Sequence, residues 1–137
     1  QGLERISQLK DYTTICGSAP SELLAIIALR GKERILEEQN ERTRQNLSVL
    51  DAFFDHYQEL FSWNRPKGGS ICFPRMLTVE NTFAFSEKVL AETGIMLAPS
   101  RAFQYGDQHL RIGFGRENLP QVVELFSQYL GQHFIQN

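Results

Sequence analysis

The chain has 137 residues, of which 42% are hydrophobic, and these values fit one small globular domain or a large part of a bigger protein. Its 14 lysines and arginines nearly balance 16 aspartates and glutamates, which gives a net charge of −2. Because a phosphate backbone attracts basic surfaces, this balance argues against a nucleic-acid partner. No apolar run approaches the roughly 20 residues of a membrane span and no signal peptide opens the sequence, so we expect a cytoplasmic protein without a membrane partner.

The first third of the sequence predicts helices. Apolar residues recur every three positions over residues 1–12, which is the pattern of an amphipathic helix. Ser18 and Pro20 are residues that favour the start of a second helix, whose segment 23–29 is almost wholly apolar and suited to burial. Past Gly31 the sequence becomes charged, which predicts a solvated helix with a bend near that glycine.

An apolar stripe then returns at spacings of three and four, and it predicts that the long helix continues with one face against a core. The residues of this stripe are Leu47, Leu50, Phe53, Phe54, Tyr57 and Phe61. The pattern Asn46-Leu47-Ser48 also matches an N-glycosylation acceptor, but it lies inside this helical stretch, so we interpret the match as chance.

The second half alternates strands with helices. Proline and glycine at residues 66–69 predict a hairpin-like turn before the first strand. The predicted strands are 70–73, 95–98 and 110–114, and the predicted helices are 81–93 and 118–133, the first of them stopped by Gly94. We expect the strands to share one sheet with the helices against it. The predicted fold is therefore an α+β two-layer sandwich of a small three- to four-stranded sheet covered by helices and preceded by a long connecting helix.

The cysteines and histidines predict no metal or redox site. Cys16 and Cys72 lie far apart in apolar sequence, so both are expected to be buried free thiols of a cytosolic protein. The histidines, His56, His109 and His133, are too scattered for the spacing of metal ligands.

Two other short patterns are also given structural explanations. Ser7 and Lys10 have the spacing by which a lysine can activate a serine, but the accompanying motifs of such enzymes are missing. Gly113 and Gly115 resemble part of a dinucleotide loop, but a third glycine and the βαβ context are missing. We interpret the glycines as a strand end where two backbones approach closely.

Arg111 is the one candidate binding residue that the pattern itself singles out. It stands in the middle of an apolar strand, where a guanidinium is costly unless an anion meets its planar fork. From spacing alone the anion can be a carboxylate of the protein or one of a ligand, and a position at the sheet edge would also explain the residue.

Several segments spread over the whole chain form an ordered series. They are Leu9–Cys16, Ser18–Ser21, Pro66–Gly69, Thr93–Pro99, Ala102–Phe103 and Leu110–Phe114. The later segments match the patterns G-[IV]-x-[VL]-x-P-[GS]-x-x-F and [LV]-R-[IL]-x-[FY]. In order and approximate spacing, the series resembles the second half of the class I and II pyridoxal-phosphate (PLP) aminotransferases, which are enzymes of fold type I.

The resemblance implies a role for Arg111. In that family the arginine of the last motif grips the α-carboxylate of the amino-acid substrate, and Arg111 is the matching residue. It further implies a parent enzyme that moves an amino group between an amino acid and a 2-oxo acid by means of PLP. A decarboxylating, condensing or cyclising enzyme of the same fold type, or a stand-alone α+β binding domain, is the alternative.

The sequence departs from the family in two places. Ser100 stands where glycine is usual, which leaves the shape of the following loop open. Lys10 is followed by Asp-Tyr-Thr-Thr and so is not the cofactor lysine, and no other residue of the chain is assigned to catalysis, cofactor or metal.

We therefore expect a C-terminal fragment of a longer, dimeric biosynthetic enzyme, inactive alone because the cofactor lysine and most PLP contacts lie upstream. Its expected parts are residues 1–18 from the large domain, a connecting helix over 19–61 and a small C-terminal domain over 62–137. The apolar segment 23–29, suited to contact with the large domain or a partner subunit, should be partly exposed in this chain.

Overall fold

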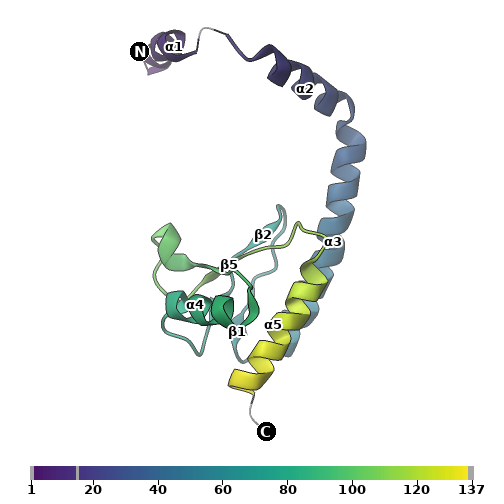
Figure 1. The fold of residues 1–137 in the computed structure, drawn as a ribbon, viewed down its shortest axis with the longest axis vertical. Coiled ribbons are helices and arrows are strands. Elements are labelled where there is room, and N and C mark those ends of the chain that lie inside the picture. Colours follow the sequence, from purple (N-terminus) through teal and green to yellow (C-terminus); the bar gives the residue numbers. More distant parts are fainter. Residues whose placement is uncertain (1, 15, 136–137) are drawn as a thin grey trace. The chain divides into compact units, whose positions relative to one another are not determined.

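The structure is a computed structural model that describes residues 2–14 and 16–135 (Figure 1). The described residues form five α-helices, one 3-10 helix and five short strands. In chain order these are α1 (Gly2–Thr13), α2 (Ala19–Arg30), α3 (Lys32–His56), β1 (Phe61–Ser62), β2 (Ile71–Cys72), β3 (Arg75–Met76), α4 (Thr82–Thr93), β4 (Ala98–Pro99), η1 (Ser100–Phe103), β5 (Leu110–Gly113) and α5 (Leu119–Phe134). The chain divides between Glu38 and Gln39 into two compact units.

The first unit is helical and has no buried residue in α1 or α2. The expected exposure of the apolar segment 23–29 is confirmed, because its large side chains keep between 45% (Ile26) and 67% (Leu29) of their surface exposed. The bend expected at Gly31 is a break, since α2 ends at Arg30 and α3 begins at Lys32. Among residues 2–14 and 16–135, no helix has the length and hydropathy that crossing a membrane requires.

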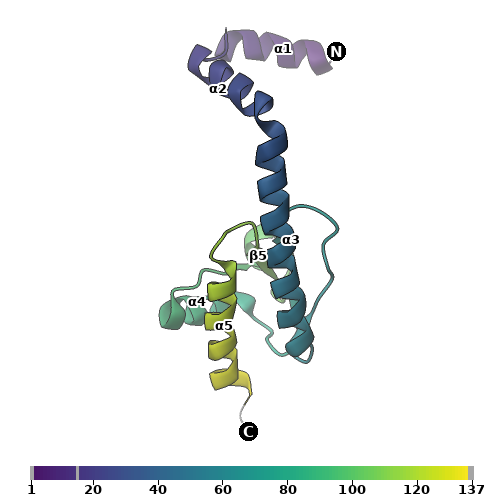
Figure 2. The ribbon, with the colours of Figure 1, turned by 90° about the vertical axis from the view of Figure 1, so that its right-hand side faces the viewer.

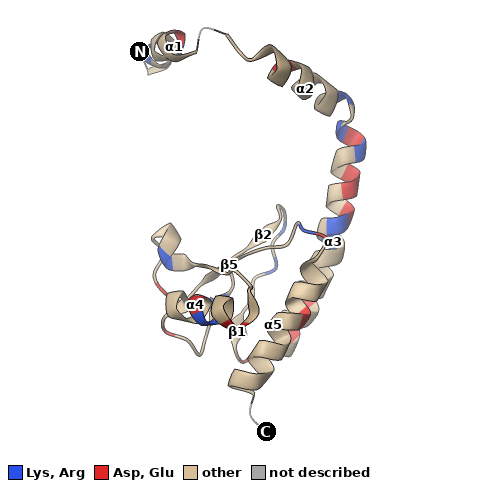
Figure 3. Ribbon diagram, in the orientation of Figure 1, with Lys and Arg blue, Asp and Glu red and all other residues tan. Residues whose placement is uncertain are grey.

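Charged residues of both signs occupy much of the N-terminal half of α3, as expected for a solvated helix (Figure 3). Within it, Arg34 lies 3.9 Å from Glu38 and Arg44 lies 3.0 Å from Glu41, and all four side chains are more than half exposed. Ion pairs as exposed as these contribute little to stability.

The second unit contains the predicted sheet. Strands β2, β5 and β4 form one antiparallel sheet in that order, which confirms that the three predicted strands lie together. Cys72 pairs with Ile112, and Ala98 pairs with Arg111. The α+β class, with a small sheet covered by helices, is confirmed.

Helices α3, α4 and α5 build the core of this unit. The predicted apolar stripe is buried, but the helix ends at His56, before its last members, and Phe61 lies in β1. Helix α5 runs alongside α3 (Figures 1 and 2). The Phe53 and Phe126 rings stack at 5.6 Å, and the Tyr57 hydroxyl donates to the Ser127 carbonyl at 3.0 Å. Phe85 of α4 lies 6.3 Å from the same Phe126 ring. The three helices therefore meet around one aromatic cluster, on which the sheet rests.

Two strand predictions are wrong in detail. Residues 66–69 do not form a hairpin turn, because β1 pairs with β3 while β2 pairs with β5. The physical reason is burial, since pairing Phe61 with Met76 puts both side chains into the core, at 3% and 0% exposure. The strand predicted at 95–98 pairs only at Ala98–Pro99, and Pro99 is accommodated because β4 is an edge strand.

The cysteine prediction is half right. Cys72 is buried, and burial raises the pKa of its thiol to about 12. Cys16 is exposed, contrary to the prediction, because it lies in the connection between α1 and α2, where no core forms.

Asn46 is a buried structural residue rather than a glycosylation site. Its Nδ2 donates to the Phe114 carbonyl at 2.8 Å and to the Arg116 carbonyl at 2.7 Å. One amide group therefore joins α3 to the end of β5. Of the two glycines for which a close approach was expected, Gly115 shows one, because a Cβ there would lie 3.2 Å from the Cβ of Ser70, whereas a Cβ at Gly113 would lie 4.0 Å from the Ser70 carbonyl, an ordinary contact.

We predict that Asn46→Ala lowers the free energy of unfolding by about 2 kcal/mol, because one buried and one partly buried carbonyl lose their donor. Denaturant unfolding of the chain measures this change. Ser48→Ala is the matched control: it also removes the glycosylation pattern, but it deletes only an exposed hydroxyl on a helical carbonyl and should change stability by less than about 0.5 kcal/mol. Equal stability of the two variants would contradict the role of Asn46.

Candidate functional site

Arg111 lies on the open face of the central strand. In β5 the side chains alternate: Leu110 is fully buried, Arg111 is exposed, and Phe114 beyond the strand is fully buried. Because β5 has a neighbour on each side, Arg111 is not at a sheet edge. Its partner across the strands is Ala98, whose small side chain leaves space beside the guanidinium.

The Arg111 guanidinium has an aromatic neighbour. Its Cζ lies over the Phe103 ring, 5.1 Å from the centroid. Within the described residues no carboxylate forms an ion pair with it. Other arginines of this unit differ, since Arg44 pairs with Glu41, Arg65 with Asp51 and Arg101 with Asp107.

Aromatic side chains surround the same face. The Phe73 ring stacks on the His109 ring at 5.0 Å with 12° between the planes, and Tyr105 lies 5.5 Å from Phe73 and 5.1 Å from His109. Phe103 completes the group at 6.2 Å from Phe73. We call Phe73, Phe103, Tyr105, His109 and Arg111 the outer-face cluster.

The loop that carries Phe103 is held at its base by Ser100. This side chain is fully buried, and its hydroxyl donates to the Gly106 carbonyl at 2.8 Å and accepts from the His109 N–H at 3.1 Å. Glycine, the usual residue here in the family that the sequence resembles, has no hydroxyl to make these bonds. The loop shape that the sequence left open is therefore fixed by Ser100 itself.

A second tie closes the loop on its exposed side. The Arg101 guanidinium donates to both carboxylate oxygens of Asp107, at 2.8 and 2.9 Å. These hydrogen bonds hold the pKa of Asp107 below its usual range and the pKa of Arg101 above its own. Gln104 between them adopts a left-handed conformation, with φ of 57°, which turns the chain back toward β5.

The charge around the cluster is positive. Arg75 donates to the side-chain carbonyl of Gln108, at 3.1 Å from Nε and 2.6 Å from Nη2, and within the part of the chain that the structure describes it has no carboxylate partner. Burial, and secondarily the charge of Arg75, lower the pKa of His109 below its ordinary value. Within the described residues the guanidiniums of Arg75 and Arg111 have no acidic partner, and it is these two positive groups, not the neutral His109, that suit an anionic ligand.

The sequence singled out Arg111 but missed the residues around it. Phe73 and Arg75 alternate with the buried Cys72, Pro74 and Met76, so continuing the period-two pattern through residue 76 could have placed both on the open face. No sequence signal could have found His109 stacked on Phe73, because that contact depends on the register between β2 and β5.

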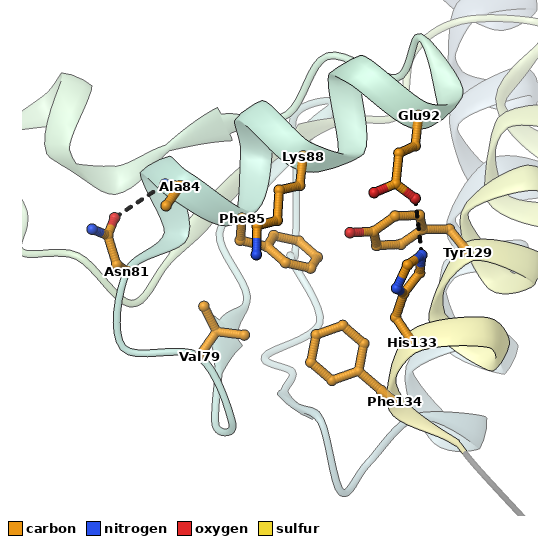
Figure 4. A pocket seen from close by; sticks show the side chains of 9 residues that line it. All are labelled: Val79, Asn81, Ala84, Phe85, Lys88, Glu92, Tyr129, His133 and Phe134. Carbon is orange, nitrogen blue, oxygen red and sulfur yellow. Dashed lines mark hydrogen bonds and ion pairs between the residues drawn. The ribbon is translucent and has the colours of Figure 1, made fainter.

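A separate cavity of about 480 Å³ lies between α4 and α5 and does not include Arg111 (Figure 4). Its lining residues are Val79, Asn81, Ala84, Phe85, Lys88, Glu92, Tyr129, His133 and Phe134. The His133 Nε2 lies 2.9 Å from a Glu92 carboxylate oxygen, and burial together with the charge of Glu92 raises the pKa of Tyr129. The histidines therefore stay apart, with His133 here, His109 in the outer-face cluster and His56 exposed at the end of α3.

Comparison with known proteins identifies the relatives of this fold. A PLP-dependent aminotransferase from Streptococcus suis superposes with a TM-score of 0.83 and 30% identity, covering 96% of this chain and 35% of that one. The chain is a relative of the PLP-dependent aminotransferases. Capreomycidine synthase from Streptomyces vinaceus is 25% identical over 133 residues, which are 96% of this chain and 34% of that protein.

Further comparisons extend the likeness to cyclases. The PLP-dependent cyclase OrfR shares the fold, with a TM-score of 0.78 and 24% identity over 91% of this chain and 35% of that one. No protein-family model matches the chain. The chain spans about a third of the length of these relatives, consistent with the C-terminal small domain of the aminotransferases, and the resemblance read from the sequence is confirmed.

The described residues do not fit PLP as a site of their own. The lysines of the chain, Lys10, Lys32, Lys67 and Lys88, are all exposed. Lys88 is the one that borders the cavity between α4 and α5, and that cavity is also lined by the carboxylate of Glu92, a negative group that would repel a cofactor phosphate. No chemical step through PLP is therefore assigned to these residues.

We predict that acidification lowers the free energy of unfolding of the chain because His109 takes up a proton less readily when folded. Its folded pKa lies below the ordinary 6.5, so the unfolded chain takes up the proton first as the pH falls. The free energy of unfolding should decrease from pH 6.5 downward and level off below the folded pKa. Denaturant unfolding at a series of pH values should show this decrease flattened in His109→Gln, and a control variant at an exposed histidine, His56→Gln, should retain it.

Proposed function

We propose that the chain is the C-terminal part of a PLP-dependent aminotransferase in which Arg111 binds the α-carboxylate of the amino-acid substrate. The observation that carries the proposal is the exposed Arg111 guanidinium on the central strand, with an aromatic ring beneath it and no acidic partner among the described residues. The motif Leu110–Phe114 supports the same assignment, because it matches the motif that contains the carboxylate-binding arginine in the family that the sequence resembles.

The chemistry of Arg111 in this role is positioning. A guanidinium donates two parallel N–H bonds to a carboxylate, which fixes both the distance and the plane of the bound group. With the carboxylate held, the substrate Cα has a defined orientation toward the rest of the enzyme. An amino acid and a 2-oxo acid both carry this carboxylate, so the same residue serves both halves of an amino-group exchange.

The cofactor in this proposal is bound by the large domain of the same protein. PLP supplies the reactive group for amino transfer, and the relatives are PLP-dependent by name. Since the lysines described here are exposed and form no cofactor cradle, the chain alone is expected to be inactive.

A cyclising enzyme is the second candidate. Capreomycidine synthase matches over 96% of the chain, and OrfR is named a cyclase. The carboxylate of an amino-acid substrate needs the same arginine in either reaction, so the outer-face cluster supports both. Mass analysis of the products that the full-length enzyme forms from amino acids, with and without a 2-oxo acid acceptor, separates amino transfer from cyclisation.

The same proposal assigns partners to the first unit. Residues 1–18 belong to the large domain, 19–61 to the connecting segment and 62–137 to the small domain. The connecting segment, expected as one helix, consists of α2, α3 and the turn that leads into β1. The apolar surface of α2 is then covered by the large domain or by the second subunit of a homodimer.

We predict that Arg111→Ala in the full-length enzyme costs about 3 to 5 kcal/mol of transition-state binding, or roughly 10² to several times 10³-fold in kcat/KM, because a carboxylate must be bound without its partner. Arg111→Lys should recover part of the loss, since it restores the charge but not the planar fork. Steady-state kinetics with amino-acid substrates measure both variants.

The control for this experiment is Arg116→Ala, which removes an exposed arginine next to the same strand and should leave kcat/KM unchanged. Cofactor absorbance should be the same in all variants, because Arg111 is not a cofactor residue in this proposal. Wild-type kcat/KM in Arg111→Ala would refute the assignment.

We further predict that the 137-residue chain self-associates through α2. Leu23 and Ile27 are one helical turn apart and are 60% and 58% exposed, so pairing two copies removes apolar surface from water. Light scattering should show a concentration-dependent mass that the double variant Leu23→Glu, Ile27→Glu abolishes with helical content retained. Leu90→Glu, at a 47% exposed site on α4, is the matched control and should still associate, and a monomeric wild type would contradict the prediction.

A further inference from the structure

The Phe103 ring lies against a guanidinium, that of Arg111, for which the structure shows no ion pair among the residues that it describes. The Arg111 Cζ lies 5.1 Å from the centroid of the Phe103 ring, within the range in which an aromatic face attracts a cation. A guanidinium over a ring keeps its N–H groups free at the edge, where a planar anion can meet them. Among the described residues, this ring is the one contact that the structure shows for the Arg111 guanidinium.

Phe103 is itself fixed by the loop around it. Ser100 ties the start of the loop to Gly106 and to the His109 N–H, and the pair Arg101–Asp107 ties the two sides together. The Phe103 ring also meets the Phe73 ring edge-on, at 6.2 Å and 82°. The ring is therefore a rigid surface on a braced loop.

We propose that Phe103 is a positioning residue that holds the Arg111 guanidinium ready for the substrate carboxylate. The proposal rests on the function proposed for Arg111. A long arginine side chain without partners samples many rotamers, and ordering it on binding costs affinity. Phe103 removes much of that cost before the substrate arrives and does not need to touch the substrate or the reacting bond.

The test compares Phe103→Leu, Phe103→Met and Phe103→Tyr in the full-length enzyme. Loss of the ring should raise KM for the amino acid roughly three- to fivefold, the effect expected from one partly exposed cation–π contact, and change kcat little. Phe103→Tyr keeps the ring and should behave as wild type. Binding of the matching amine without a carboxylate should be unaffected by any of the variants.

Phe83→Leu is the matched control, since Phe83 is 42% exposed against 44% for Phe103 and has the Arg101 guanidinium over its ring at 5.9 Å. It should leave KM unchanged. Thermal unfolding of each variant establishes that it is folded. Because Phe103→Leu and Phe103→Met both remove the ring, the conclusion holds even if one of them fails to fold.

A double-mutant cycle separates the positioning role of Phe103 from the carboxylate-binding role proposed for Arg111. In an Arg111→Ala background, Phe103→Leu should have no further effect on kcat/KM, because the group that it positions is gone. If Phe103→Leu costs the same in both backgrounds, or if Phe103→Tyr is as impaired as Phe103→Leu, the positioning role is wrong while the carboxylate role of Arg111 stands. If Arg111→Ala does not change kcat/KM, the carboxylate-binding role proposed for Arg111 is wrong, and the positioning role of Phe103 is rejected with it.

Discussion

The period-two alternation of β5 is the constraint on which the core and the candidate site both depend. Leu110 and Phe114 point into the core and are fully buried, and this fixes the face on which the intervening Arg111 must lie. A slip of one residue would bury a guanidinium without a partner and expose two large apolar side chains, each at a cost of several kcal/mol by general estimates. The core therefore enforces the exposure of Arg111.

The connection from α3 to the end of β5 makes this register robust. Asn46 donates to two carbonyls just after the strand, where the backbone has left the ladder and still needs donors. Gly115 then allows the chain to pass close to Ser70. Helix α3, the sheet and the start of α5 are thus joined at one place, on the opposite side of β5 from the open face.

The parts of the fold that the sequence predicted are those fixed by local chemistry. The aromatic stripe of α3 and the helix stopped by Gly94 were found because spacing and a left-handed terminal residue are visible in the sequence, and Gly94 has φ of 74° in the structure. The pairing of β1 with β3 was missed because it depends on which buried side chains, Phe61 and Met76, fit together in the core. Long-range packing of this kind has no signature in spacing.

The site was predictable to the same extent. Arg111 was found because a charge in an apolar strand is anomalous, whereas Phe73 and His109 form a stacked pair that only the register reveals. Ser100 shows the opposite error: as a departure from a family pattern it left the loop uncertain, and in the structure its hydroxyl is what defines the loop. Serine in place of the usual glycine therefore gives this loop a defined shape through two side-chain hydrogen bonds.

The difference between Arg101 and Arg111 shows what separates a structural arginine from a candidate binding one. Each lies over a phenylalanine ring, and both are exposed, so neither burial nor aromatic contact distinguishes them. The Arg101 guanidinium donates to both carboxylate oxygens of Asp107, and this pair closes the loop. Arg111 lies over a different ring, that of Phe103, and has no such partner in the described chain, so its planar fork is free to meet an external carboxylate. The loop that carries Phe103 is the one that the Arg101–Asp107 pair closes.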